Sequence, residues 1–188
     1  MKKLTVLLSI PALAVTLFAF TLPAGKLVST KTHIKFFSHT AVEDIEANNN
    51  ASVSTIDLAT GDIVFSIPMQ SFEFEKTMMQ KHFNEDNYLD TKNFPKAKLK
   101  AKITNLSEIN FSKDGTYQAT VKGELTIKGV TKPISENGTI TVKGNKIEVQ
   151  SKFNITLADY GITFVKGKPA SAIAKTVEIT VHAEYQTK

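Results

Sequence analysis

The stretch Tyr117–Ile134, YQATVKGELTIKGVTKPI, decides the fold class of this chain. Up to Ile127 its odd positions are apolar or glycine, whereas its even positions are all polar. Alternation with a period of two residues predicts a strand with one buried face and one solvated face. The alternation lasts for eleven residues, about twice the length of a usual strand, which favours a barrel or a large sheet. Small residues on the inner face, Ala119 and Gly123, leave volume that a facing side chain or a ligand must fill.

The same alternation, punctuated by turn sequences, recurs along most of the chain. Ala59-Thr60-Gly61-Asp62 marks a hairpin turn, and Ala41–Asn50 is expected to form a loop or an edge. The predicted strands are Lys26–Thr30 and His33–Thr40 (one strand or two), Ser52–Leu58, Asp62–Ile67, Lys96–Thr104, Tyr117–Ile127, Thr139–Lys143, Lys146–Leu157 and Thr176–Thr187. A chain of about eight strands at hairpin spacing closes into an all-β antiparallel barrel or a sandwich.

One segment, Phe72–Tyr88, breaks the alternation. Met78, Met79, His82 and Phe83 are spaced i, i+1, i+4 and i+5, the stripe of a short amphipathic helix. We expect this helix to cover one end of the sheet or barrel. Its apolar side chains, those of Met78, Met79 and Phe83, are predicted to face the barrel opening as a lid.

The first residues have the pattern of an export signal. Lys2 and Lys3 precede an apolar run over Leu4–Leu22, as in a secretory signal peptide. We therefore expect residues 1–24 to be a signal peptide cleaved after Ala24, with Ala19 as the alternative position, and residues 25–188 to form one exported domain. The expected location is the periplasm or the medium. No stable membrane span is expected after cleavage.

Composition excludes several classes of function. The chain has no cysteine, which removes thiolate chemistry and most structural zinc sites. Its net charge of +5 falls to +3 without Lys2 and Lys3, and the lysines are scattered, so they are expected to keep strand edges soluble. With no arginine-rich run and no basic patch with aromatics, no nucleic-acid partner is expected.

No catalytic or metal site emerges from the sequence. His33 and His39 share a strand face but lie about 20 Å apart, too far to hold one ion. The acidic residues fall in polar stretches, and no nucleophile elbow, P-loop or dinucleotide motif occurs. We therefore expect no enzyme activity, no metal and no cofactor.

Three segments together resemble the YceI-like family. Gly123–Ile134, GELTIKGVTKPI, resembles the family signature G-x-L-T-I-x-G-V-T-K-P. Phe153–Ile162, FNITLADYGI, is similar to a later family element, F-x-I-x-x-x-D-[FY]-G-I. Met79–Pro95 resembles the stretch in which the family has a Met, a His and then [FY]-P before a strand. The resemblance implies an exported, lipocalin-like antiparallel β-barrel, and some family members hold a polyisoprenoid chain in a long apolar cavity.

These observations lead to two functional hypotheses. The first is an exported binding protein that sequesters or carries an isoprenoid or a similar long apolar lipid in the barrel lumen. The second is a ligand-free structural or interaction module of the cell envelope, with its inner face filled by its own side chains. The oligomeric state stays open, a homodimer included. The residues expected to line the lumen and bind the ligand are Phe65, Met79, Phe83, Ala101, Tyr117, Ala119, Val121, Gly123, Leu125, Phe153, Ile155, Val181 and Ala183.

Overall fold

The computed structural model describes residues 25–41, 43–163 and 174–187, and the predicted signal peptide lies outside these ranges. The described chain is almost entirely β, with one α-helix and three short 3₁₀ turns. Its strands are β1 (Lys26–His39), β2 (Asp44–Asn49), β3 (Val53–Asp57), β4 (Asp62–Pro68), β5 (Glu73–Phe74), β6 (Lys96–Ile103), β7 (Gly115–Ile127), β8 (Val130–Lys143), β9 (Lys146–Thr156) and β10 (Thr176–Gln186). The helices are η1 (Met69–Ser71), α1 (Thr77–Asn84), η2 (Leu106–Glu108) and η3 (Leu157–Tyr160).

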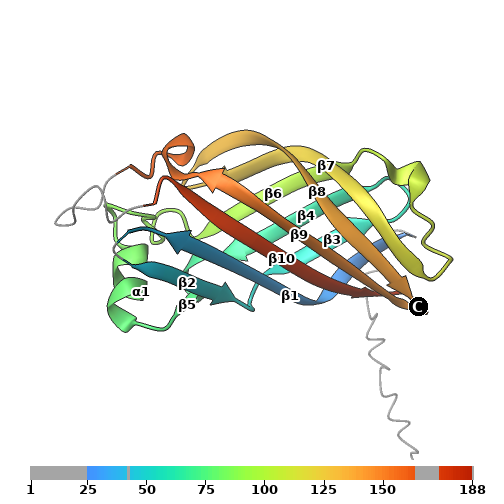
Figure 1. Cartoon of the computed structure of the whole chain (residues 1–188), viewed down its shortest axis with the longest axis horizontal. Coiled ribbons are helices and arrows are strands. Elements are labelled where there is room, and N and C mark those ends of the chain that lie inside the picture. Colours follow the sequence, from blue (N-terminus) through green and yellow to red (C-terminus); the bar gives the residue numbers. More distant parts are fainter. Residues whose placement is uncertain (1–24, 42, 164–173, 188) are drawn as a thin grey trace, which may run out of the picture.

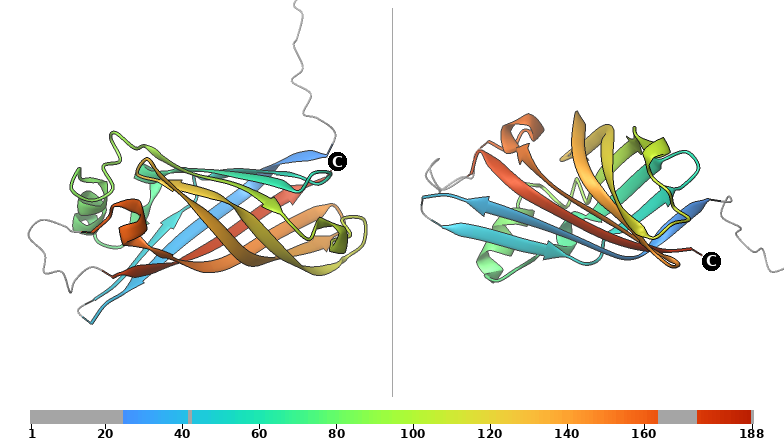
Figure 2. Two further views of the ribbon diagram at one scale, coloured as in Figure 1. Left: turned by 90° about the horizontal axis from the view of Figure 1, so that it is seen from above. Right: turned by 45° about the vertical axis from the view of Figure 1, so that its right-hand side comes forward.

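Eight of these strands close into an antiparallel barrel. The ring order is β10-β9-β8-β7-β6-β4-β3-β1, and β1 closes the ring by pairing with β10. The closure confirms the predicted all-β barrel and excludes the sandwich. Figures 1 and 2 show an elongated barrel with α1 and η3 at one end and η2 at the other. We call these the α1 end and the η2 end.

The β7–β8 hairpin forms as its alternation predicts. Ile127 pairs with Val130 across a tight turn in which Lys128 and Gly129 both have positive φ, 49° and 76°. A Cβ at Gly129 would lie 2.8 Å from the Phe94 ring, so glycine also lets that ring pack on the turn. Pro133 removes no hydrogen bond to β9, because β8 pairs with β9 only from Gly138 onward and Pro133 lies before that stretch.

The barrel wall parts in two places at the α1 end. The N-terminal half of β8 and the C-terminal end of β9 do not pair, and η3 lies against β8 there. On the other side β1 changes its partner along its length. It pairs with β3 through Lys26–Val28 and with β2 from Ile34 onward, and β2 then pairs with β5. The Ala41–Asn50 region, expected to be a loop or an edge, thus contains β2, which lies between β1 and the short terminal strand β5, and the Lys26–Thr40 region forms one strand.

The predicted helix is confirmed as α1, but the predicted lid is wrong in its detail. Met78 is 62% exposed and Met79 is only half-buried, whereas Phe83 is buried. A helix of eight residues presents little more than one side chain per turn to a neighbouring surface. Phe83 takes that position, so the two methionines do not cap the opening. Within the described residues, no helix has the length and apolar character needed to cross a bilayer.

Candidate functional site

The α1 half of the barrel lumen contains an apolar cavity of about 110 Å³. Every described residue in its wall has an apolar or aromatic side chain, and the only polar side-chain atom among these residues is the Tyr88 hydroxyl. The lining residues are Ile34, Phe36, Phe65, Ile67, Met69, Phe72, Phe83, Tyr88, Leu89, Ala97, Leu99, Leu125, Ile127, Phe153, Ile155, Leu157, Ile162, Val177, Ile179 and Val181. They come from β1, β4, β6, β7, β9 and β10 and from the helical segments that close this end.

Several wall residues on inner strand rows stay partly exposed. Phe36 and Phe153 both pair with Ile179, and all three side chains are only partly buried. Leu99, on the inner row of β6, is also partly buried. Residues of an inner row do not face the bulk solvent outside the barrel. Their remaining exposure is therefore toward the cavity, which marks the place where more apolar surface could still be covered.

Five aromatic side chains close the side of the cavity next to α1. We call Phe36, Phe72, Phe74, Phe83 and Tyr88 the aromatic cluster. Phe83 lies at its centre: its ring stacks on Phe36 at 5.6 Å and 13°, and its centroid lies 5.1–6.2 Å from those of the other three. Ring pairs at these distances stabilise by about 0.5–1.5 kcal/mol each beyond burial. The cluster therefore fixes α1 and β5 against β1 through a single helix residue.

The η2 half of the lumen is packed solid. Its inner rows hold fully buried side chains, among them Tyr185, Ile140, Ile147 and Ile103, each at most 2% exposed. The Tyr185 hydroxyl shares a 2.7 Å hydrogen bond with Ser54 Oγ. Burial raises the pKa of Tyr185 to about 12, so this hydroxyl stays protonated at neutral pH. Among the described residues no buried side-chain polar atom lacks a partner, as a solid core requires.

Of the residues predicted to line the lumen, the structure brings six together around the cavity. These are Phe65, Phe83, Leu125, Phe153, Ile155 and Val181. Whether they hold a ligand is untested and stays a prediction. The remaining seven do not line the cavity: Met79, Ala101, Tyr117, Ala119, Val121, Gly123 and Ala183.

The small inner residues have a different role from the predicted one. Ala119 and Ala183 are 3% and 0% exposed, so no open space adjoins them. At Gly123 an added Cβ would lie 2.2 Å from Lys100 O and 2.4 Å from Ala101 Cα. Glycine is needed there because the β6 backbone occupies the place of a side chain. Small size on this inner face thus accommodates close strands and bulky facing residues, not a ligand.

The sequence analysis missed most of the cavity wall, although the signal was present. Leu99 and Ala97 belong to the same inner row as Ala101, and Ile179 and Val177 to the same row as Val181. Alternation alone could have identified them. Ile34 and Phe36 lie on the even, inward positions of β1, where the alternation is less regular because Phe37 faces outward.

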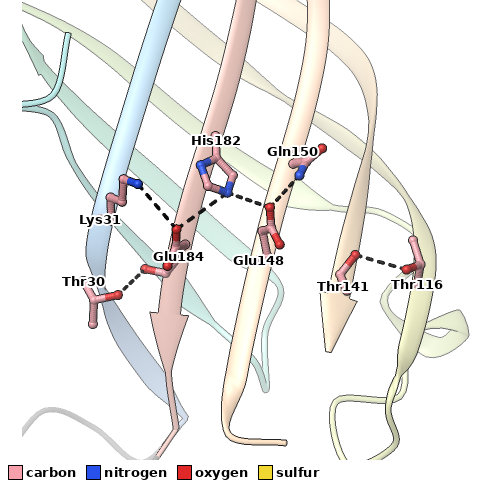
Figure 3. Close-up of polar contacts among 8 residues, drawn as sticks. All are labelled: Thr30, Lys31, Thr116, Thr141, Glu148, Gln150, His182 and Glu184. Atoms are coloured by element: carbon pink, nitrogen blue, oxygen red, sulfur yellow. Dashed lines mark hydrogen bonds and ion pairs between the residues drawn. The ribbon is translucent and has the colours of Figure 1, made fainter. Parts of the chain in front are cut away.

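The chemistry available in the cavity is limited to apolar contact and one hydroxyl. Burial raises the pKa of Tyr88 to about 12, so it is a neutral hydrogen-bonding group and no base at neutral pH. No group of three or more potential metal-binding side chains converges among the described residues. His182 lies outside the barrel, where its Nε2 is 2.6 Å from Glu148 Oε1 (Figure 3). Hydrogen bonds from Gln150 and His182 lower the pKa of Glu148.

The chain is similar in fold to several solved structures. The Burkholderia cenocepacia protein BcnA is 19% identical, with a TM-score of 0.68 over 81% of this chain and 95% of that one. A polyisoprenoid binding domain from Saccharophagus degradans is 14% identical, with a TM-score of 0.71 over 87% of this chain and 99% of that one. The Campylobacter jejuni YceI protein is 16% identical, with a TM-score of 0.58 over 100% of this chain and 99% of that one.

At these identities the similarity concerns the fold alone. No curated protein matches the chain. The model of the YceI-like domain, in contrast, matches residues 26–185, which includes every strand of the barrel. The chain therefore belongs to the YceI-like family.

Proposed function

We propose that this protein binds a long apolar molecule of the isoprenoid or a similar lipid class, with the apolar part in the α1 half of the barrel. The observation that carries the proposal is the cavity wall, in which the described residues contribute no charged side chain and one hydroxyl. Such a wall recognises its ligand by removing apolar surface from water, at about 25 cal/mol per Å². The polyisoprenoid binding domain from Saccharophagus degradans, with the same fold, supports this ligand class.

The size of the cavity sets a condition on binding. Its 110 Å³ is below the roughly 300–1,000 Å³ of typical ligand pockets and close to the ~150 Å³ engineered cavity that takes up benzene. A long chain therefore needs side chains to move outward. Leu99 and Ile179 are only partly buried, so they are the wall groups that can move with the smallest loss of burial. Binding then buries their remaining exposed area together with that of the ligand.

Two further expectations belong to this proposal. We propose that the protein is a binder and not an enzyme, because Tyr88, the only titratable group among the described residues of the cavity wall, stays neutral at physiological pH. We also propose that it acts after export, as the Lys2-Lys3 region and the apolar run that follows predict. The alternative of a ligand-free module draws its support from the solid η2 half.

Native mass spectrometry of the gently purified, exported protein tests the proposal. We expect a mature mass that begins between Phe20 and Lys26, plus an adduct of lipid mass. Ile179→Trp fills the cavity from a partly exposed wall position and should reduce the adduct at least about tenfold. Thr180→Tyr, on the outer row of the same strand, is the matched control and should retain it.

Two outcomes would contradict the proposal. One is wild-type protein that is bare in repeated preparations and takes up no added geranylgeraniol, which would favour the ligand-free module. The other is an adduct that survives in Ile179→Trp with the protein still folded, which would place the lipid outside this cavity. A mass that still includes Met1 would disprove cleavage without affecting the cavity.

A further inference from the structure

A row of four lysines lies along the outer face of β6. We call Lys96, Lys98, Lys100 and Lys102 the β6 lysine row. All four are exposed and alternate with inward Ala97, Leu99, Ala101 and Ile103. At a rise of ~3.3 Å per residue, neighbouring lysines of the row start about 6.6 Å apart. Lys122 of β7 pairs with Lys102 and extends the positive charge onto the next strand.

Most of this charge is not ion-paired among the described residues. Of the four lysines in the row, only Lys102 forms an ion pair with a described residue. Its partner is Asp62 at 3.6 Å, and both groups are well exposed. Glu124 is the register partner of Lys100, but no ion pair joins them within 4.0 Å. Lys96 and Lys98 face Pro68 and Ser66 of β4, and Lys98 also faces Thr126 of β7. Like charges at this spacing are within a Debye length of about 8 Å and repel each other.

The opposite side of the barrel has a different charge pattern. β10 lies four strands from β6 in either direction around the ring. On that side Lys31 is 3.9 Å from Glu184, Lys152 is 2.9 Å from Glu178, and His182 contacts Glu148 (Figure 3). Lysines there are matched by carboxylates on neighbouring strands. The β6 side therefore has neighbouring lysines without ion pairs, whereas Lys31 and Lys152 on the β10 side are paired with carboxylates.

Protection of a sheet edge does not explain the β6 lysine row. Lysines that prevent edge-to-edge association belong on strands with an unpaired side. β6 pairs with β4 on one side over Lys96–Lys102 and with β7 on the other over Lys98–Ile103. Hydrogen bonds to β4 and β7 already protect β6 from edge-to-edge association, so the lysine row is not needed for that purpose. An external anionic partner would remove the repulsion between its members.

We propose that this face docks onto the surface of a bilayer that contains anionic phospholipids. The sequence has no arginine, so the face lacks the forked donors with which proteins bind single phosphates or bases bidentately. The outer rows of β6 and β7 over this stretch hold lysine, glutamate and threonine, without an aromatic side chain. Protein interfaces have an apolar core and single-stranded nucleic acids need aromatic platforms. Exposed ammonium groups on a long strand instead match a layer of phosphate headgroups.

Vesicle sedimentation with the mature protein tests this docking surface. Vesicles of phosphatidylcholine alone are compared with vesicles that also contain phosphatidylglycerol, at low and high salt. We expect binding only to the anionic vesicles, weakened by salt. The triple variant Lys96→Gln, Lys98→Gln, Lys100→Gln should bind them roughly 100-fold more weakly, given the contribution of each lysine near such a surface.

A matched triple variant separates the row from net charge. Lys113, Lys143 and Lys146 are exposed, lie at the η2 end, and lose the same charge when all three become Gln. This control should bind within about fivefold of wild type. Melting curves check the fold of each variant, and Lys98→Glu gives a single-site version if the β6 triple variant is unstable.

Three results would overturn the inference, which does not depend on whether the cavity holds a lipid. They are wild-type protein that ignores anionic vesicles at low salt, equal losses in the two triple variants, and retention on DNA or an acidic protein without vesicle binding. If the wild-type protein instead binds anionic vesicles but carries no lipid adduct, that result counts against the proposed cavity ligand and leaves the docking surface intact. The two proposals can therefore fail separately.

Discussion

The two halves of the barrel lumen are built from the same long strands and differ in packing. On β7 the inner row runs from Tyr117 through Ala119 and Val121 in the η2 half to Leu125 and Ile127 in the α1 half. The η2 half mixes small and bulky residues, and its large side chains Tyr185, Ile140 and Ile147 are each only 1% exposed. The α1 half has bulky residues on almost every strand, and the wall parts between β8 and β9 and between β1 and β3.

The difference shows that the size of inner side chains does not by itself predict a cavity. Small residues in the η2 half let the strands come close, so Tyr185 and Ile140 fill the middle. In the α1 half the strands separate, and α1, η3 and the aromatic cluster cover the gaps without filling the centre. Strand separation therefore controls the space in this barrel more than residue volume does.

The largest expected effect is a contrast between two isoleucines. Ile147→Ala, in the solid half at 1% exposure, should lower the free energy of unfolding by about 2–5 kcal/mol, as for other core truncations. Ile179→Ala, in the cavity wall, should lower it by less than about 2 kcal/mol, because that side chain is already partly exposed. Urea unfolding of both variants measures the difference. Equal losses would mean that the α1 half is packed as tightly as the η2 half.

The second contrast concerns two buried tyrosines, one in each half. The pKa values of Tyr185 and Tyr88 are both raised from 10 to about 12 by burial. The folded protein therefore holds these protons between pH 10 and 12 while the unfolded chain releases them. Stability is unaffected below pH 10 and falls as the pH rises to 12, on the order of 2–3 kcal/mol for each tyrosine.

Phenylalanine variants separate the two tyrosines. Each of Tyr185→Phe and Tyr88→Phe should remove about half of the fall between pH 10 and 12 in urea titrations. At pH 7 Tyr185→Phe should lose about 1 kcal/mol, because Ser54 loses its 2.7 Å partner. Tyr88→Phe should be nearly neutral at pH 7, since no described residue hydrogen-bonds its hydroxyl. An alkaline fall that persists in the double variant would assign it to Tyr160, whose pKa is also raised by burial.

The sequence predicted the parts of this structure that depend on local patterns. Alternation identified the long β7 strand, Gly61 and Gly129 marked real turns, and the spacing of Met79 and Phe83 identified α1. The family motifs led to the barrel. Partner changes along a strand are not local, so neither the switch of β1 from β3 to β2 nor the parting of β8 from β9 could be predicted.

The candidate site was half predictable for the same reason. Parity placed Leu125, Phe153 and Val181 on inner rows, and they do line the cavity. Parity could not show at which height along the barrel the lumen opens, because that depends on the distance between strands. Residues from irregular segments, such as Met69 of η1 and Ile162 after η3, enter the wall through tertiary packing and carry no periodic signal.

The smallest expected effect tests the boundary between the two halves at Gly123. An added Cβ there would meet backbone atoms of β6 at 2.2–2.4 Å, and backbone cannot rotate away as a side chain can. Gly123→Ala should therefore lower the free energy of unfolding by about 1–3 kcal/mol. Gly115→Ala on the same strand is the control: its Cβ would meet only the Tyr117 side chain, at 3.3 Å, and should change stability by less than about 0.5 kcal/mol. Thermal melting of the two variants gives the comparison. If Gly123→Ala were as stable as wild type, open space would adjoin Gly123, and the cavity would extend into the η2 half of the barrel.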